Sequence, residues 1–416
     1  MLKHYVYCIH QEILNKGLIG GLHSSYCLFI NNTVKPKIKS AIILPTHNNL
    51  NRAGIAIISG CEGDTKRYRC FHQKEELEHF GINADVFDYY GINFKTILDY
   101  YDIFILHRIP LTKKYRDLII SGKQRGKIFI FESDDLIFDE NYAQYIRILD
   151  ILPPGEVDLY LNDLRQFNET MQLCDYALCS TEYLKTELES HGKKTYINLN
   201  AVSDEMVELA KKAVSERKRI PGSTVKIGYM SGTRTHNADF IIAEDALIRI
   251  LTEFENVELV IGGYLDLSEK FSPFKDRIIR QPFMDWKKLP KYIADFDINI
   301  SPFEDTPFSN AKSDLKYFEA ALLQVPTISS NVGGYTSQIQ NFKNGFLVST
   351  SQEWYNALKL LITDEELRLT IGRNAESDVL NKRTTKITGK NLVQIIEEIK
   401  RDAQKKKMAS GEMGMH

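Results

Sequence analysis

Short apolar runs, rich in β-branched and aromatic residues, alternate with helical stretches along most of this chain. One series of runs ends near residue 199, and a second series begins near residue 226. Strands that alternate with helices form parallel sheets with helices on both faces, so the pattern predicts an α/β fold. The predicted strands are 41–45, 55–59, 84–89, 103–107, 127–132, 176–180 and 194–199, then 226–231, 257–262, 276–281, 298–302, 326–330 and 345–348.

The alternation is interrupted once, at 204–224, where a charged helix is followed by Pro221 and Gly222. A chain of 416 residues is long enough for two or three domains. We therefore predict two Rossmann-like domains that face each other across a cleft. The predicted segments are an N-terminal extension without an assigned role (1–38), an N-terminal domain (39–205), a linker (206–225), a C-terminal domain (226–384), and a helix that crosses back to the first domain, with a tail (385–416).

Charge and cysteine content exclude several classes of protein. The 53 Lys and Arg residues nearly balance the 55 Asp and Glu residues, which argues against a dedicated nucleic-acid binder. The six cysteines form no C-x-x-C pair, which fits reduced thiols in the cytosol. No apolar run approaches the roughly 20 residues of a membrane helix, and the first residues do not read as a secretory signal. We expect a cytoplasmic protein.

The stretch 301–334 carries the densest set of polar residues at a predicted strand end. Ligands of open α/β domains bind at the carboxyl ends of strands, so this position is a candidate site. Ser309 and Asn310 are good N-cap residues, and we predict a helix that runs from them to about Gln324.

On that helix Lys312, Lys316 and Glu319 fall within an arc of about 60°, at about 100° per residue. Two lysines in the first turns oppose the helix dipole, and an anionic ligand at the helix start removes the conflict. Glu319 is then placed to accept ribose hydroxyls. The alternative is a solvated face with an i,i+3 salt bridge, and spacing alone leaves both open.

A second candidate loop follows the strand at 226–231. Ser231, Gly232 and Thr233 form a turn in which glycine lets backbone amides approach a phosphate. Arg234 adds a phosphate contact and His236 a hydrogen bond. The alternative is an ordinary βα loop with a capping Ser or Thr.

The N-terminal half offers a cluster of cations, Lys66, Arg67 and Arg69, in a loop and a first helical turn. Cations at a helix start are unfavourable unless an anion lies nearby. They indicate either an anionic ligand or scattered surface charge.

Paired carboxylates, Asp134 and Asp135, follow the strongly apolar strand 127–132. Such a pair can accept sugar hydroxyls, hold a cation or act as a base. The alternative is an Asp N-cap beside a solvated Asp. His107 ends the strand 103–107, where a lone histidine is more often structural than catalytic.

Taken together, these motifs resemble the retaining GT-B glycosyltransferases of the family-four type. In the second half the resemblance rests on SGTRTH, NISPF, SDLKYFEAALLQVPTISSNVGG and KNGFLV. In the first half KRYRCFHQKEELEHFGINADVF, YYDIFILHRIP, FIFESDDLIFD and CDYALCSTEYL resemble a bacterial branch that builds surface polysaccharides. The resemblance covers roughly 53–380.

The resemblance implies a GT-B fold and a nucleotide-diphosphate sugar held mainly by the second domain. Glu319 matches the second acid of the family's Glu-x7-Glu motif, whereas the first acid position holds Ala311. The residues expected to stabilise the leaving diphosphate are Arg234, Lys312 and Lys316. The expected donor contacts are Ser231, Gly232, Thr233, His236, Asn310, Ser313 and Glu319. The expected acceptor contacts are Arg67, Arg69, His107, Asp134 and Asp135.

The expected activity is transfer of a sugar to a glycan or lipid-linked acceptor, with retention and with neither a metal nor a cofactor. Ala311 motivates an alternative, a catalytically inactive GT-B protein that binds a partner transferase or a glycan. A nucleotide-sugar epimerase of the same architecture is a third interpretation. No G-x-G-x-x-G follows the first strand, which disfavours a dehydrogenase. The basic segment 400–407 makes peripheral contact with the inner membrane a weaker alternative.

Overall fold

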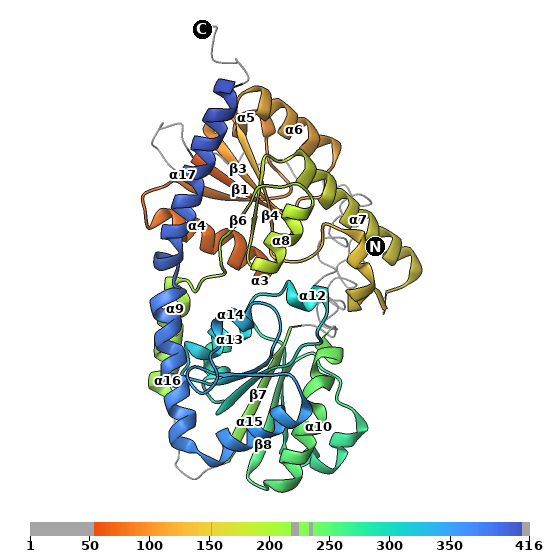
Figure 1. Ribbon diagram of the computed structural model, residues 1–416, viewed down its shortest axis with the longest axis vertical. Helices are drawn as coiled ribbons and strands as arrows, with labels where there is room; N and C mark the ends of the chain where they lie inside the picture. The colour runs from red at the N-terminus through yellow and green to blue at the C-terminus, as the bar shows by residue number, and fades with distance from the viewer. Residues whose placement is uncertain (1–53, 151, 218–223, 233–235, 410–416) are drawn as a thin grey trace, which may run out of the picture. The chain divides into compact units, whose positions relative to one another are not determined.

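Each of the twelve runs predicted as strands from 55–59 onward forms a strand in the computed structural model, as β1 to β12. The structure describes residues 54–150, 152–217, 224–232 and 236–409. The predicted strand 41–45 and the extension 1–38 lie outside these ranges. Within them the strands form two six-stranded parallel sheets, so the predicted α/β class is confirmed. The chain divides into two compact units, each built on one sheet (Figure 1).

The N-terminal unit combines 54–144, 152–203 and 383–409 of the described chain, and its strand order is β2-β1-β3-β4-β5-β6. Its strands are β1 (Gly54–Ser59), β2 (Ala84–Asp88), β3 (Tyr101–His107), β4 (Ile128–Ser133), β5 (Tyr176–Cys179) and β6 (Thr195–Ile197). Its helices are α3 (Asp64–Lys66), a π-helical turn η1 (Arg67–Phe71), α4 (His72–Glu78), α5 (Phe94–Tyr100), α6 (Lys113–Gln124), η2 (Glu140–Tyr145), α7 (Pro154–Leu173), α8 (Glu182–Ser190) and α17 (Thr385–Ala409).

Helix α17 completes the core of the N-terminal unit. It packs against α4, although about 300 residues separate the two along the chain (Figure 1). Its apolar face buries Leu392, Ile395, Ile396 and Ile399 in one cluster with the residues of β1 and β3. These four positions recur at helical spacing, and they bury one face of an otherwise polar helix.

The C-terminal unit contains η3 and residues from 204 to 382, with the strand order β12-β11-β10-β7-β8-β9. Its strands are β7 (Val225–Ser231), β8 (Val257–Gly263), β9 (Ile278–Gln281), β10 (Ile298–Ser301), β11 (Thr327–Ser330) and β12 (Phe346–Val348). Its helices are η3 (Arg147–Asp150), α9 (Asp204–Glu216), α10 (Asn237–Glu253), η5 (Glu269–Arg277), α11 (Leu289–Ile293), α12 (Pro307–Asn310), α13 (Leu315–Ala321), α14 (Tyr335–Gln338), α15 (Ser351–Thr363) and α16 (Glu365–Lys382).

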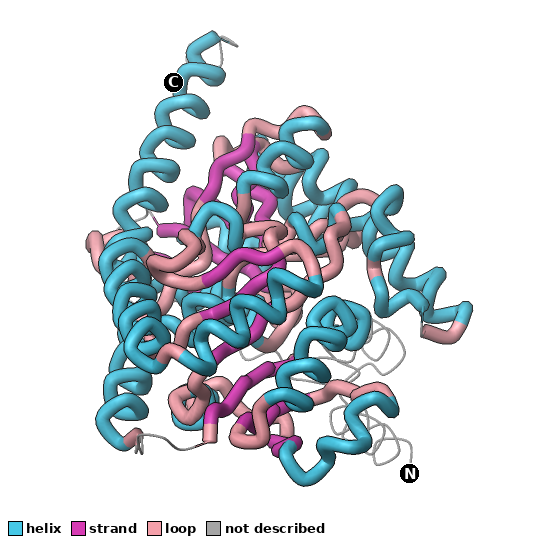
Figure 2. Tube along the Cα trace, turned by 60° about the horizontal axis from the view of Figure 1, so that its bottom comes forward, coloured by secondary structure: helices cyan, strands magenta, loops and turns pink. Residues whose placement is uncertain are grey.

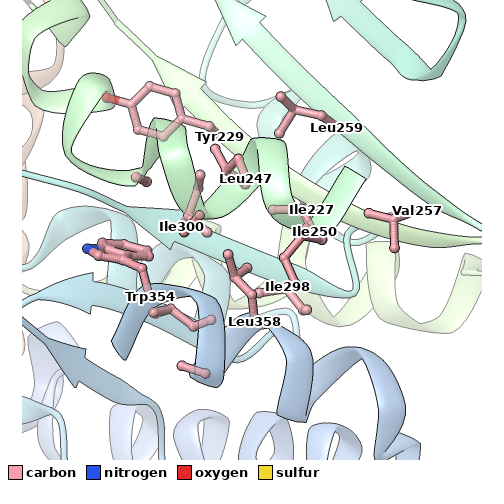
Figure 3. Packing of buried hydrophobic residues seen from close by; sticks show 14 of the residues in the cluster. Ile227, Tyr229, Leu247, Ile250, Val257, Leu259, Ile298, Ile300, Trp354 and Leu358 are labelled. Atoms are coloured by element: carbon pink, nitrogen blue, oxygen red, sulfur yellow. The ribbon is translucent and has the colours of Figure 1, made fainter. Parts of the chain in front are cut away.

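A few residues of helix α15 determine where the helix begins and which of its faces packs against the core. Thr350 accepts a hydrogen bond from the backbone of Glu353 at 3.2 Å, and the Glu353 carboxylate accepts one from the backbone of Thr350 at 3.1 Å. This capping box satisfies two backbone donors that have no partner within the helix. Trp354 and Leu358 then point into the apolar cluster beside Ile300 (Figure 3).

In both sheets the strand order reverses direction next to the first strand, between β1 and β3 and between β7 and β10. Such a switch point leaves the carboxyl ends of two neighbouring strands free of a crossing connection, and it is where ligands of open α/β sheets bind. Helices flank the strands in each unit (Figure 2). Among the helices within the described ranges, none combines the length and the apolar character that a membrane span requires.

Candidate functional site

The switch point of the C-terminal unit joins the start of α10 to the loop after β10. His236 immediately precedes α10, and its Nδ1 lies 2.9 Å from Oδ2 of Asp239 in the first turn. The other oxygen, Oδ1 of Asp239, accepts a hydrogen bond from the backbone N–H of Glu304 at 3.1 Å. Asp239 therefore fixes both the imidazole ring and the loop.

The protonation states of this pair follow from its surroundings. Burial lowers the pKa of His236, and the nearby charge of Lys316 lowers it further. Burial opposes ionisation of Asp239, but the hydrogen bonds from His236 and Glu304 and the charge of Lys316 together outweigh it and lower the pKa of that carboxyl. At neutral pH His236 is therefore neutral and Asp239 ionised. A carboxylate can only accept, so Nδ1 donates to Asp239 and Nε2 is left as an acceptor.

Lys316 lies in the first turn of α13 and is half-buried. Its Nζ is 5.2 Å from the ring centroid of Phe303 and 5.9 Å from that of Tyr229. Across the described ranges, no carboxylate comes within 4.0 Å of this ammonium group. Burial lowers its pKa, although the charges of Asp239 and Glu319 act in the opposite direction. Aromatic faces thus hold a cation without an ion-pair partner in the described chain, and an anion bound there would stabilise it.

The single helix predicted from Ser309 and Asn310 to Gln324 is wrong, because the segment forms two short helices, α12 and α13. The N-cap of α12 is Thr306, whose Oγ1 accepts a hydrogen bond from the backbone of Ser309 at 3.1 Å. Only Lys316 and Glu319 share a helix, α13, and Lys312 stands in the connection before it.

The break after α12 is stabilised by the loop after β11. The carbonyl of Lys312 accepts a hydrogen bond from the backbone of Gly334 at 2.9 Å, and Oδ1 of Asn310 accepts one from Gly333 at 3.1 Å. Gly333 has a φ of 58°, and a Cβ there would lie 2.8 Å from the carbonyl oxygen of Ser309. Glycine is therefore required for the two loops to touch.

The remaining predicted donor residues of this segment surround the same loop. The Nζ of Lys312 lies 4.3 Å from the ring centroid of Phe308, and its charge lowers the pKa of Lys316. Ser313 packs against Gly334, and Glu319 is half-buried one turn after Lys316. Ala311 has no exposed surface.

The last residue of β7 anchors the backbone beside the loop that follows the strand. Ser231 is buried, and its Oγ donates a hydrogen bond to the carbonyl of Tyr264 at 2.7 Å. Gly232 faces open space, because no described atom lies within 4 Å of the position that a Cβ would take there. Thr233 and Arg234 lie outside the described residues.

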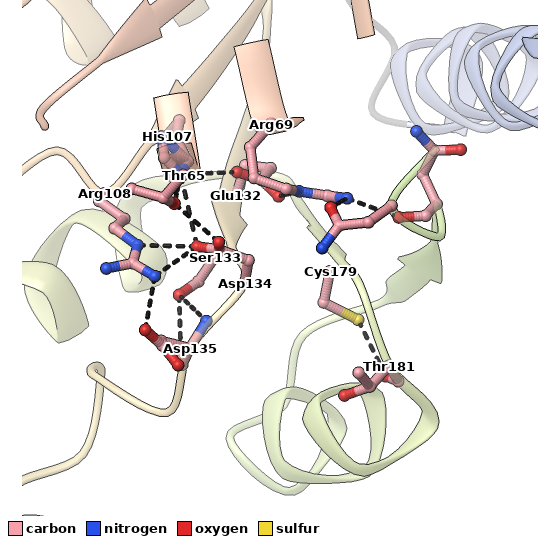
Figure 4. Close-up of polar contacts among 12 residues, drawn as sticks. Thr65, Arg69, His107, Arg108, Glu132, Ser133, Asp134, Asp135, Cys179 and Thr181 are labelled. Atoms are coloured by element: carbon pink, nitrogen blue, oxygen red, sulfur yellow. Dashed lines mark hydrogen bonds and ion pairs between the residues drawn. The ribbon is translucent and has the colours of Figure 1, made fainter. Parts of the chain in front are cut away.

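At the switch point of the N-terminal unit, His107 and Asp134 come together with Thr65 (Figure 4). Thr65 donates a hydrogen bond to Oδ2 of Asp134 at 2.7 Å, and its Oγ1 lies 3.3 Å from Nε2 of His107. His107 is completely buried, which lowers its pKa to about 3, despite the opposing charge of Asp134. The imidazole is therefore neutral at physiological pH.

Arg108 connects the two predicted carboxylates. Its Nε donates to Asp134 at 2.8 Å and its Nη2 to Asp135 at 2.7 Å. Burial opposes ionisation of Asp134, but the charges of Arg108 and Arg69 and the hydrogen bond from Thr65 together hold the pKa of that carboxyl well below its usual range. Arg108 has a φ of 47°, a left-handed conformation that is uncommon outside glycine and is often kept at functional sites.

The basic cluster of the N-terminal unit is neutralised by the protein's own carboxylates. Lys66 pairs with Glu62 and Asp88, and Arg67 pairs with Asp64 at 3.1 Å. Arg69 is fully buried and pairs with Glu132 at 2.6 Å. All three side chains are buried, so the interpretation as scattered surface charge is wrong, and the protein's own carboxylates already balance their charge.

Sequence reasoning missed several residues that build the two sites. In the sequence, Asp239 looks like an ordinary acid in a first helical turn, and Phe303 looks like part of a strand end. Arg108 could have been predicted as a site residue, since it directly follows an apolar strand. The partners of Thr65 and Glu132 lie 42 to 69 residues away along the chain, so local pattern does not reveal them.

Comparisons with known proteins relate part of this chain to glycosyltransferases. Residues 224–364 match the model of a family described as glycosyl transferases group 1. The chain is 34% identical over 167 residues to the capsular polysaccharide biosynthesis glycosyltransferase CapM of Staphylococcus aureus, a match that covers 38% of this chain and 42% of that protein. The match thus spans less than half the length of this curated relative.

Two solved structures share the fold over most of the chain. The HepE structure from Anabaena, in complex with UDP, aligns with a TM-score of 0.57 and 15% identity, over 83% of this chain and all of that one. A glycosyltransferase from Rickettsia africae aligns with a TM-score of 0.59 and 14% identity, over 84% of this chain and 99% of that one. The expected GT-B fold, with its two Rossmann-like parallel sheets, is confirmed.

Proposed function

Taking residues 224–364 as a domain of the glycosyl transferases group 1 family, we propose that the protein moves a sugar from a nucleotide-diphosphate sugar to a hydroxyl of a glycan or lipid-linked acceptor. The C-terminal unit holds the donor, and the N-terminal unit holds the acceptor. The reaction belongs to bacterial surface polysaccharide synthesis and takes place in the cytoplasm, at the inner face of the membrane where the acceptor is lipid-linked. The likeness to CapM and the UDP in the HepE structure support this proposal.

The observation that carries the proposal is the half-buried ammonium of Lys316 at the switch point. Within the described part of the chain it has aromatic neighbours and no carboxylate within 4.0 Å. A diphosphate supplies the missing negative charge, and Lys312 adds a second cation beside it. Glu319, one turn along α13, takes the ribose hydroxyls.

In the proposed reaction the acceptor oxygen bonds to the anomeric carbon while the bond from that carbon to the diphosphate oxygen breaks. The nucleoside diphosphate leaves with the electron pair, and one of its phosphate oxygens accepts the hydroxyl proton, which gives retention. The sugar passes through an oxocarbenium-like state while negative charge grows on the leaving group. Lys312, Lys316 and Arg234 stabilise that charge, which is usually the largest electrostatic contribution to such catalysis. The proposal requires neither a metal ion nor an organic cofactor.

The acceptor side uses the carboxylates held by Arg108. Asp134 and Asp135 accept hydrogen bonds from sugar hydroxyls, and Arg108 positions them by hydrogen bonds at 2.8 and 2.7 Å. His107 supports Asp134 through Thr65, whose Oγ1 lies 3.3 Å from Nε2 of the imidazole and donates to Oδ2 of Asp134 at 2.7 Å.

A nucleotide panel tests the donor site. Thermal stability is measured with UDP, GDP, ADP, CMP and dTDP for the wild type, for Glu319→Ala and for Glu366→Ala, which alters an exposed acid of α16. A ligand at 100 times its dissociation constant stabilises a protein by about 2.7 kcal/mol. We expect one nucleotide to raise the melting temperature of the wild type and of Glu366→Ala, and to have little effect on Glu319→Ala.

Turnover then separates the proposed activity from its alternatives. A donor sugar consumed only when a glycan acceptor is present supports the transferase. Consumption without acceptor indicates an epimerase or a hydrolase, and binding without consumption indicates a non-catalytic protein. If no nucleotide stabilises the wild type, the donor site is refuted.

A further inference from the structure

Two aromatic rings stack on each other at the carboxyl edge of the C-terminal sheet. Tyr264 directly follows β8 and Phe283 follows β9, with ring centroids 5.7 Å apart and planes inclined by 21°. The side chain of Phe283 is 57% exposed, so this ring is not part of the core. An exposed apolar ring in a fixed orientation is a ready surface for another flat ring.

Hydrogen bonds anchor the backbone that carries Tyr264, the inner ring of the platform formed by Tyr264 and Phe283. The Oγ of Ser231 donates to the carbonyl of Tyr264 at 2.7 Å, and Arg280 donates to the carbonyl of Leu265 at 2.6 Å. Gly263 has a φ of 77°, and a Cβ there would lie 1.9 Å from the carbonyl oxygen of Ser231. Only glycine allows β8 to end so close to β7, and this contact fixes the position of the tyrosine.

The position of the platform matches the length of a nucleotide. The strands β9, β8, β7 and β10 are neighbours in that order, and they are parallel, so their carboxyl ends lie along one edge. At a spacing of about 4.8 Å per strand, the end of β9 lies about 10 Å from the end of β7. The latter end carries the His236 and Lys316 cluster.

We propose that Tyr264 and Phe283 form the stacking surface for the nucleobase of the donor. This inference rests on the proposed function and adds to it the residues that bind the base. The base lies against the exposed face of Phe283, and Tyr264 supports that ring from behind. The diphosphate then reaches Lys316 along the sheet edge. Stacking tolerates any base, because every base has an aromatic face.

The test compares a ligand that has a base with one that has none. Affinities for UDP and for inorganic pyrophosphate are measured by calorimetry on the wild type, Phe283→Ala and Phe283→Tyr. Phe342→Ala is the matched control, since Phe342 is 64% exposed and packs on Phe346 with centroids 5.0 Å apart. Removal of a stacking ring is expected to weaken UDP binding about 5- to 100-fold.

Support for the platform is a loss of UDP affinity in Phe283→Ala, recovery in Phe283→Tyr, and unchanged pyrophosphate affinity in all variants. Unchanged UDP affinity in Phe283→Ala overturns the platform and leaves the proposed function standing. An equal loss for UDP and pyrophosphate also overturns it, because the effect is then not specific to the base. A wild type that binds pyrophosphate but no nucleotide refutes both.

Discussion

The guanidinium Nε of Arg69 lies 2.6 Å from Oε1 of Glu132, and neither side chain exposes any surface. Burial raises the pKa of Glu132 to about 7, even though the charge of Arg69 acts to lower it. Arg69 also donates to the carbonyl of Asn198 at 2.8 Å and to Oδ1 of Asn200 at 2.9 Å. One buried cation therefore ties η1 to the ends of β4 and β6, directly beneath the carboxylates proposed to bind the acceptor.

Replacement of Arg69 by methionine is expected to lower the free energy of unfolding by about 3–5 kcal/mol, because the change leaves a buried carboxylate without its partner. Urea denaturation measures the effect. The control is Arg165→Met, which removes an exposed pair with Glu140 at the same N–O distance of 2.6 Å and should cost less than about 1 kcal/mol. Similar losses in the two variants would show that burial does not govern the Arg69 pair.

Glu76 is expected to make stability depend on pH. Burial raises its pKa from 4.5 to about 7, against hydrogen bonds from Thr388 and Asn198 that lower it. Between these pH values the folded state binds more protons than the unfolded chain, so the free energy of unfolding falls as the pH rises. At about 1.4 kcal/mol per pKa unit, the total is on the order of 3 kcal/mol.

The measurement is urea denaturation from pH 4.5 to 8 for the wild type and Glu76→Gln. The free energy of unfolding of the wild type, minus that of Glu76→Gln, should fall as the pH rises from 4.5 to about 7. Above about pH 7 this difference should stay constant. Glu78→Gln, at an exposed position of the same helix, should follow the wild type. Parallel profiles for the wild type and Glu76→Gln would contradict the prediction.

Loss of the Lys316 charge is expected to affect catalysis more than folding. Lys316→Met keeps the aliphatic stem and removes the cation, so kcat should fall about 100-fold, as for other groups that stabilise charge in a transition state. Because the same cation lowers the pKa of His236, an NMR titration of the variant should show a higher pKa for that imidazole. Lys343→Met, at an exposed position of the same unit, should change neither quantity. An unchanged kcat in Lys316→Met would remove the lysine from the proposed mechanism.

Gly333→Ala is expected to destabilise the C-terminal unit and weaken nucleotide binding. A new methyl group would lie 2.8 Å from the carbonyl of Ser309 and 2.9 Å from that of Lys312, so the loop before α13 must move. Gly192→Ala separates this clash from backbone strain alone, since Gly192 also has a positive φ but no described atom lies within 4 Å of its Cβ position. Gly192→Ala should lower the free energy of unfolding by about 1–2 kcal/mol. Gly333→Ala should lower it further, and urea denaturation measures both effects. Equal losses would mean that the loop contact is unimportant.

The strands were predictable because each is a short apolar run bounded by polar turns, and β1 and β3 are buried almost throughout. The sequence predicted that Lys316 and Glu319 share a helix face, because they are three residues apart, and both lie in α13. The break that excludes Lys312 from that helix depends on hydrogen bonds from Gly333 and Gly334, about twenty residues later. The local sequence around Lys312 therefore could not predict it. For Arg69 the sequence left an anionic ligand and surface charge both open, since its actual partner Glu132 is 63 residues away.

Helix α17 contributes Leu392, Ile395, Ile396 and Ile399 to a core whose first described strand begins at Gly54. The whole sheet of the C-terminal unit is encoded between these two pieces. On the ribosome, domains generally fold as units while synthesis proceeds from the N-terminus. Here the unit that emerges first must wait, with one side of its core uncovered, until the other unit has been translated. Its core is thus completed only when a single late helix arrives.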